Sequence, residues 1–307
     1  MLSGTGSDAI QTVTREQLIS RCDFFVESQV WPLKRVIDPK PWLDNFHQDE
    51  MDHALHLLNG FMFFNNELIT RLFVSAFQQL SRPASLPSSY QQAQASFRTF
   101  ISEALVVHVT GETPNASDSG HLFVRMARDR LSIRQERIVS PEQALEQLFV
   151  TPDVPVVFVD DFVGTGNQFL TMWRRDYQVA HQSTPISFQR LSSVLPRGGR
   201  FYYCSVICTE RGRGAIAAQC PSVVLCPAHF LHEHYSALST KSVIWPAHLR
   251  DSARSFLESA SQRAGIPDRG GNVGDWRGYQ HLGLAIGFEH GVPDATLLFE
   301  GQRFKMV

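Results

Sequence analysis

The chain has 307 residues, enough for one large domain or for a core with an appended subdomain. Its 28 basic residues nearly balance its 30 acidic ones, which argues against a strong overall attraction to nucleic acid or to an anionic membrane. No apolar stretch is long enough to span a bilayer, no signal-peptide pattern opens the sequence, and the 5 cysteines are odd in number; we therefore expect buried thiols in a soluble, cytoplasmic protein.

The first hundred residues carry apolar side chains at helical spacing. A capping-box sequence at Thr14 precedes the first helical stripe. Further stripes of this kind occupy residues 51–58, 68–80 and 90–104. We predict a helical N-terminal region over residues 1–104, with its aromatic side chains in the core.

From residue 105 the pattern changes to strands that alternate with helices. Short apolar runs that predict strands occur at residues 105–109, 156–159, 201–208 and 222–226, with helical spacing between them. Such alternation predicts a parallel sheet with helices on both faces. We predict an α/β core over residues 105–307, with a divergent segment after Pro227 that ends in a short strand at 295–299.

Two adjacent carboxylates mark the end of the predicted strand at 156–159. Asp160 and Asp161 are followed by Gly164 and Gly166, which can adopt positive φ, and then by helical spacing. Peptide N–H groups at a helix start attract phosphate, while paired carboxylates can hold sugar hydroxyls or a hard divalent ion. The stretch predicts a site for a phosphorylated sugar; an ordinary strand, turn and helix with a solvated acid pair is the alternative.

Residues 156–166 resemble the phosphoribosyl pyrophosphate (PRPP) motif of the type I phosphoribosyltransferases: an apolar strand, Asp-Asp, three residues, then Thr-Gly. The resemblance implies that Asp160 and Asp161 hold the ribose hydroxyls or Mg²⁺. It also implies that the loop amides hold the 5-phosphate, and the loop residues are Val163, Gly164, Thr165, Gly166, Asn167 and Gln168.

The loop after the first core strand, residues 110–120, lines the pyrophosphate in that family. Here Ser119 and Gly120, just before a predicted helix, could present their amides to an anion. A plain surface loop explains this short sequence equally well.

A narrower resemblance extends over most of the chain from about residue 40. Residues 42–46, 160–168 and 278–294 resemble phosphoribosyltransferase-like domains found with bacterial anti-phage conflict systems, which implies a defence effector with partner proteins. Two positions depart from the wider family: Gly164 stands where purine-salvage members carry an acidic general base, and Gln168 replaces a small or hydroxylated residue.

These features predict an enzyme that uses Mg²⁺ and PRPP, or a related ribose phosphate, and that transfers or cleaves at the ribose C1 position. The departures at Gly164 and Gln168 disfavour purine salvage. They leave open the alternative of a non-catalytic sensor that binds a ribose phosphate and signals to a partner protein. Nucleic acid stays open as an acceptor.

Arginines occur near the predicted ligand edge of the sheet. Arg125 and Arg128 are one helical turn apart, and Arg211 and Arg213 follow the strand at 201–208. We predict catalytic roles for Arg125 and Arg211 in neutralising the departing pyrophosphate, with solvated helix arginines as the alternative.

Two further clusters have open interpretations. One is either a zinc site or a buried thiol with scattered surface histidines, and consists of Cys226, His229, His232 and His234. The other, Glu289-His290, follows an apolar run and could supply an acid/base pair.

Overall fold

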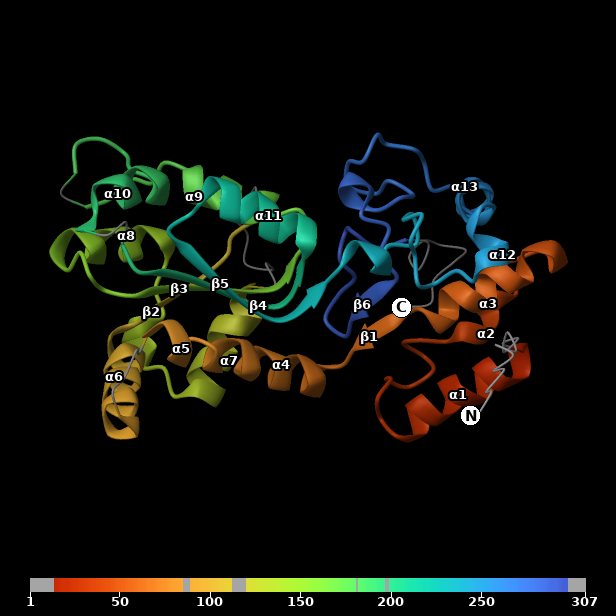
Figure 1. Cartoon of the computed structure of the whole chain (residues 1–307), viewed down its shortest axis with the longest axis horizontal. Coiled ribbons are helices and arrows are strands. Elements are labelled where there is room, and N and C mark those ends of the chain that lie inside the picture. Colours follow the sequence, from red (N-terminus) through yellow and green to blue (C-terminus); the bar gives the residue numbers. More distant parts are fainter. Residues whose placement is uncertain (1–13, 85–88, 112–119, 181, 197–198, 298–307) are drawn as a thin grey trace, which may run out of the picture. The chain divides into compact units, whose positions relative to one another are not determined.

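The structure, a computed structural model, describes residues 14–84, 89–111, 120–180, 182–196 and 199–297. The chain divides into two compact units (Figure 1). The sheet unit comprises residues 66–233, and the split unit combines residues 1–65 with residues 234–307. None of the described helices is long and apolar enough to cross a membrane.

The sheet unit is organised by a four-stranded parallel sheet with the strand order β2-β3-β4-β5. Its strands are β2 (Leu105–His108), β3 (Val156–Val163), β4 (Phe201–Thr209) and β5 (Val223–Leu231). Every residue of β4 is buried, as expected for a central strand with helices on both of its faces. The predicted α/β fold with a parallel sheet is confirmed.

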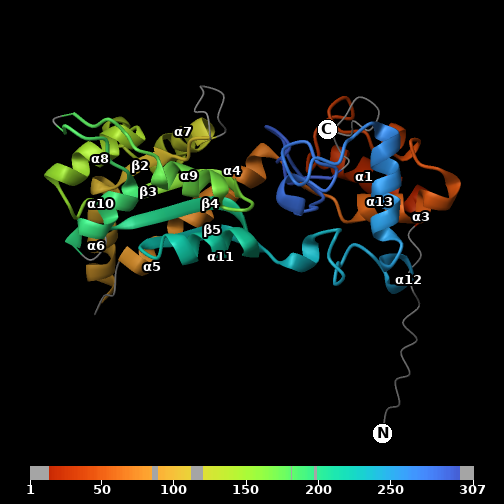
Figure 2. The same ribbon diagram turned by 90° about the horizontal axis from the view of Figure 1, so that it is seen from above.

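One face of this sheet is covered by four helices: α8 (Pro141–Val150), α9 (Asn167–Arg174), α10 (Phe188–Val194) and α11 (Glu210–Gln219). Their apolar side chains share one core with Phe158 and Phe201 of the sheet. Figure 2 shows α9 and α11 alongside β4 and β5.

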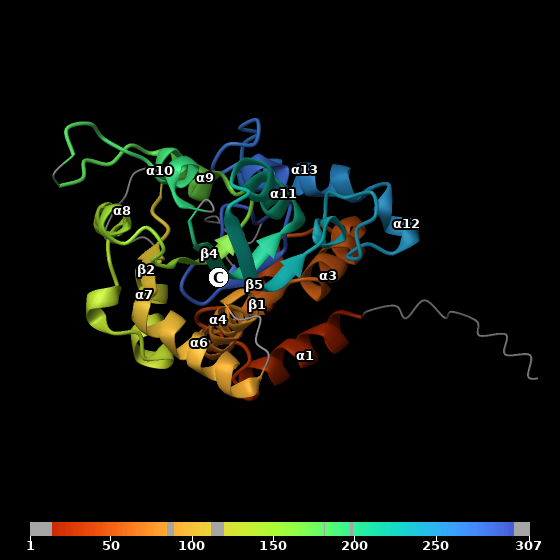
Figure 3. The same ribbon diagram turned by 60° about the vertical axis from the view of Figure 1, so that its left-hand side comes forward.

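The other face is covered by α4 (Asn66–Gln78), α6 (Tyr90–Glu103) and α7 (Gly120–Leu131), with the short α5 (Ser81–Ala84) between the first two (Figure 3). The ring of Phe100 on α6 meets Tyr202 of β4 at a centroid distance of 5.3 Å. The rings of Phe73 on α4 and Phe123 on α7 lie 5.2 Å apart. Aromatic side chains thus join these helices to the sheet and to one another, as the stripes in the sequence predicted.

The split unit pairs two short parallel strands, β1 (Met62–Phe64) and β6 (Ile286–Phe288), which come from opposite ends of the chain. Its helices are α1 (Arg15–Glu27), α2 (Pro39–Leu43), α3 (Met51–Asn59), α12 (Ala247–Arg250) and α13 (Ala253–Ala264). Their core includes fully buried Trp42, Trp245 and Leu257.

The compact units have other boundaries than the predicted division at residue 104. The apolar stripe of α4 packs on β4 and β5, so residues 66–104 belong with the sheet. The pairing of β1 with β6 joins the segment before residue 66 to the segment after residue 233. Of the strand predicted at 295–299, the described residues show only a bridge between Thr296 and Leu284.

Asp275 organises a glycine-rich loop in the split unit. Its buried carboxylate accepts the backbone N–H groups of Arg269, Gly271 and Arg277 at 2.7, 2.9 and 2.9 Å. The guanidinium of Arg277 adds a hydrogen bond of 2.9 Å. Burial opposes ionisation, but the hydrogen bonds from Arg277 and from the backbone prevail and hold the pKa of Asp275 far below its usual range.

We expect Asp275→Asn to lower the free energy of unfolding by about 3 kcal/mol or more at neutral pH, because it leaves the largely covered guanidinium of Arg277 without its buried carboxylate partner. Since the folded-state pKa lies below the unfolded-state value, this stabilisation is present above about pH 4 and is lost as the pH falls. Thermal unfolding between pH 7 and pH 3 should therefore show the gap to wild type narrowing. A constant gap would contradict the ionic explanation. Asp268→Asn, at the exposed partner of the same arginine, is the matched control.

Candidate functional site

The acid pair lies inside β3 and not after it. Pairing with β4 continues past Asp160, opposite Ser205, to Val163, opposite Cys208. The prediction that the strand ends at the acids is therefore wrong, because apolar Phe162 and Val163 continue the ladder. The carboxyl end of the strand lies at the edge where open α/β sheets bind their ligands.

The two acids occupy different environments. Asp160 is 1% exposed, and its carboxylate accepts the Tyr203 hydroxyl at 2.9 Å and the N–H of Asp161 at 3.0 Å. Burial, together with the negative charge of Asp161, raises the pKa of Asp160 well above its usual value. Asp161 is half-buried, and its Oδ1 accepts the N–H of Phe162 at 2.7 Å. Asp161 is therefore the more exposed acid of the pair.

The loop after β3 turns through a left-handed glycine into α9. Gly166 has φ 81° and is the N-cap of α9, which confirms the predicted positive φ at this position. Thr165 is buried, and its hydroxyl accepts the N–H of Asn167 at 3.3 Å. Because the N–H groups in the first turn of a helix point out of its start, α9 directs donors toward the loop.

The first turn of α11 braces this loop from the neighbouring strand. The Thr209 hydroxyl donates to the carbonyl of Gly164 and accepts the N–H of Gly212 at 3.0 Å. A Cβ on Gly212 would lie 2.6 Å from that carbonyl oxygen, and a Cβ on Gly166 would lie 3.2 Å from the carbonyl oxygen of Gly212. The loop and α11 therefore touch backbone to backbone. Sequence analysis missed this contact, although Thr-x-x-Gly after a strand is a recognisable helix start.

Tyr203 and Arg175 are two further positioning residues that sequence analysis missed. The ring of Tyr203 stacks on Phe169 of α9 at a centroid distance of 4.5 Å, while its hydroxyl binds Asp160. Arg175, just after α9, donates to the hydroxyl of Thr110 at 3.0 Å and to the carbonyl of Gly111 at 2.8 Å. It thus fixes the start of the loop that we predicted to line pyrophosphate. In the sequence both residues look like ordinary core and surface side chains.

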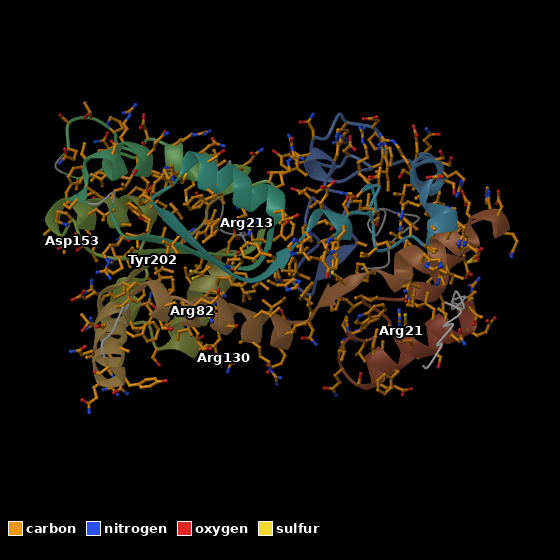
Figure 4. The ribbon with its side chains drawn as sticks, viewed as in Figure 1. Arg21, Arg82, Arg130, Asp153, Tyr202 and Arg213 are labelled. Carbon is orange, nitrogen blue, oxygen red and sulfur yellow. The ribbon has the colours of Figure 1, made fainter. Side chains whose placement is uncertain are left out.

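The predicted arginines are distributed over α7 and α11. Arg125 is exposed on α7, and Arg211 is exposed in the first turn of α11, beside the bracing contact. Arg128 forms an ion pair with Asp129 at 2.7 Å. Arg213, which is labelled in Figure 4, lies on α11, and its guanidinium is 5.0 Å from the centre of the Phe230 ring. Of the two residues predicted to present amides, Gly120 begins α7 and Ser119 lies outside the described residues.

The Cys-His cluster is dispersed over different partners. Cys226 is buried opposite Cys204 in the sheet, and Nδ1 of His232 lies 2.7 Å from the carboxylate of Glu210. His229 lies opposite Ile207 on β4, whereas His234 contacts the ring of Tyr235 in the split unit. Within the described ranges, no group of three or more His, Cys, Asp or Glu residues could hold a metal ion.

The Glu289-His290 pair belongs to the split unit, where it follows β6. The ring of His290 stacks on Phe288 at 5.4 Å, and the N–H of Glu289 donates to the carbonyl of Phe64 at 3.0 Å. The described contacts of this pair are therefore with the two-stranded sheet of its own unit.

We expect Gly212→Ala to distort the loop, because the new methyl group would meet a backbone carbonyl that cannot turn away. The free energy of unfolding should fall by about 1–3 kcal/mol, as for other overpacked sites. Gly214→Ala, in the same helix with nothing within 4 Å of the new Cβ, is the matched control and should be neutral or slightly stabilising. Chemical denaturation of both variants measures this difference in the free energy of unfolding. Equal stability of the two would contradict the close contact.

The chain can be compared with known protein families. No curated protein matches it. Residues 39–299 match the PRTase-CE family, and the match includes both acids, the loop and the bracing helix. This agrees with the resemblance to phosphoribosyltransferases predicted from the motif at 156–166. Because the match covers most of its length, the chain belongs to the phosphoribosyltransferase-like PRTase-CE family.

Proposed function

We propose that this protein binds PRPP or a related ribose phosphate at the carboxyl edge of its sheet and catalyses transfer or cleavage at the ribose C1 position. The observation that carries the proposal is the left-handed Gly166, which starts α9 five residues after the half-buried Asp161. This local geometry offers helix N–H groups for a phosphate and a carboxylate for sugar hydroxyls. Membership of a phosphoribosyltransferase-like family supports the same ligand class.

In this proposal the loop residues 163–168 hold the 5-phosphate and Asp161 holds the ribose. Mg²⁺ suits such a site, since it usually takes one or two protein carboxylates together with substrate phosphates. Asp161 fits that role, whereas the buried Asp160 does not in the present conformation. When bound, Mg²⁺ would neutralise charge on the pyrophosphate oxygens.

The reaction at C1 would pass through an oxocarbenium-like transition state. The bond to pyrophosphate breaks early, so the protein has to hold the ribose while it neutralises the departing anion. The carboxylate of Asp161 would stabilise the positive charge that develops on the ribose. Arg125 and Arg211 would meet the negative charge on the pyrophosphate. This division of charge requires no covalent nucleophile.

We extend the proposal to a role as an effector in bacterial anti-phage defence, with partner proteins of such a system. It rests on the resemblance of residues 42–46 and 278–294 to domains found with these systems. The acceptor would be a small nucleotide, a base or a nucleic acid. Cells that express the wild-type protein should survive phage infection better than cells that express Asp161→Asn. Equal survival of the two would count against this role.

A sensor without turnover is the second candidate, and a specific observation favours it. The loop has Gly164 where purine-salvage members of the wider family carry an acid, and the exposed Gln168 where the wider family carries a small or hydroxylated residue. A sensor needs only to hold the ribose phosphate, whereas an enzyme must bind the separating pyrophosphate more tightly than the intact substrate.

We expect Asp161→Asn to weaken PRPP binding by about 2 kcal/mol or more, because the amide keeps the shape but removes the charge that accepts sugar hydroxyls or Mg²⁺. Titration calorimetry with and without Mg²⁺ measures the change. Asp153→Asn, an exposed acid shortly before β3, is the matched control. Undiminished binding by Asp161→Asn would remove this residue from the site.

The arginines separate enzyme from sensor. If they act on the departing pyrophosphate, alanine at Arg125 or Arg211 should lower pyrophosphate release about tenfold or more while changing PRPP affinity little. Arg130→Ala, at the exposed end of α7, is the control. Release would be followed with PRPP, Mg²⁺ and pools of bases, nucleotides and RNA. Tight PRPP binding with no release from any pool would favour the sensor.

A further inference from the structure

We infer that the two acids of the motif have different roles: Asp161 meets the ligand, whereas Asp160 is a positioning residue that Tyr203 holds beneath the loop. The inference rests on the proposed function, because it assigns the roles within the same site. The sequence alone, in contrast, suggests that both adjacent acids bind the ribose or Mg²⁺ in the same way.

Both oxygens of Asp160 are already used inside the protein. Oδ2 accepts the Tyr203 hydroxyl at 2.9 Å, and Oδ1 accepts the N–H of Asp161 at 3.0 Å. With 1% of its surface exposed, Asp160 could reach a sugar only by breaking these bonds and leaving its pocket. Its bond to the next residue's N–H instead fixes the peptide from which the Asp161 side chain projects.

Tyr203 connects this acid to the helix that would receive the phosphate. Its ring stacks on Phe169, the third residue of α9, at a centroid distance of 4.5 Å and an angle of 20°. The same side chain therefore contacts the acid pair through its hydroxyl and α9 through its ring. Through these contacts, Tyr203 and Asp160 set the position of the sugar-binding carboxylate relative to the phosphate-binding turn.

A buried hydroxyl on the neighbouring strand serves as a control. Ser205 lies opposite Asp160 on β4 and is fully buried, and its Oγ has no hydrogen-bond partner among the described residues. Removing this hydroxyl changes the polarity beside Asp160 without breaking either of its two hydrogen bonds described above. Ser205→Ala is therefore matched to Tyr203→Phe, which removes a hydroxyl that does hold Asp160 and keeps the ring on Phe169.

The test compares ribose 5-phosphate, which needs both halves of the site, with inorganic phosphate, which needs only the loop. Tyr203→Phe should lower the affinity for ribose 5-phosphate about tenfold and leave phosphate affinity within about twofold. Asp160→Asn keeps an oxygen for the N–H of Asp161, so it should bind ribose 5-phosphate about tenfold more tightly than Asp160→Ala. Ser205→Ala should match wild type for both probes.

Two results would overturn the inference. If Asp160→Asn loses as much ribose 5-phosphate affinity as Asp160→Ala and Asp161→Asn, the charge of Asp160 itself meets the ligand. If Tyr203→Phe lowers the affinity for ribose 5-phosphate and for phosphate equally, Tyr203 supports the loop and not the acid. Failure of wild type to bind ribose 5-phosphate would instead count against the proposed function. The positioning role then still has a ligand-free readout: hydrogen exchange at the Asp161 amide should accelerate in Asp160→Ala and not in Asp160→Asn, and equal exchange would overturn it.

Discussion

The backbone between β3 and α9 lies against the first turn of α11 with no room for a side chain at Gly212. This contact requires three features at once: glycine at 212, a left-handed glycine at 166 and the hydroxyl of Thr209 between the two segments. It determines where α9 begins and therefore where its N–H groups point. Since these groups are the proposed phosphate donors, a packing constraint between two neighbouring βα units defines the proposed site.

The cost of burying charge explains why the acid pair is asymmetric. Two ionised carboxylates side by side repel each other, and the buried one would also lose its hydration. The raised pKa of Asp160 follows from these two effects, while Asp161 remains half-exposed. Burying one acid, held by Tyr203, and leaving the other half-exposed costs less free energy than burying two charges side by side. The contrast with Asp275 is instructive, because there a guanidinium and three backbone N–H groups keep a buried carboxylate ionised.

Periodicity and local rules predicted most of the helices and the parallel sheet. The capping box at Thr14 forms as the sequence indicated, and Gly166 takes the positive φ that the loop requires. These features depend on residues close together in the chain. The pairing of β1 with β6 was not predicted, because a strand of three residues has no clear periodicity and its partner lies more than two hundred residues away. The contact of Thr209 with Gly164 and that of Arg175 with Thr110 also join residues far apart in the chain, so they emerged only from the fold. Two identical adjacent acids also give no indication of which one will be buried.

A crystal structure with ribose 5-phosphate and Mg²⁺ tests the central claim most directly. We predict phosphate oxygens within hydrogen-bond distance of the N–H groups of residues 166–168, with the ribose hydroxyls or Mg²⁺ at Asp161. Asp160 should remain bound to Tyr203 in the complex. A phosphate bound elsewhere, or an Asp160 carboxylate turned out of its pocket onto the sugar, would contradict this account of the site.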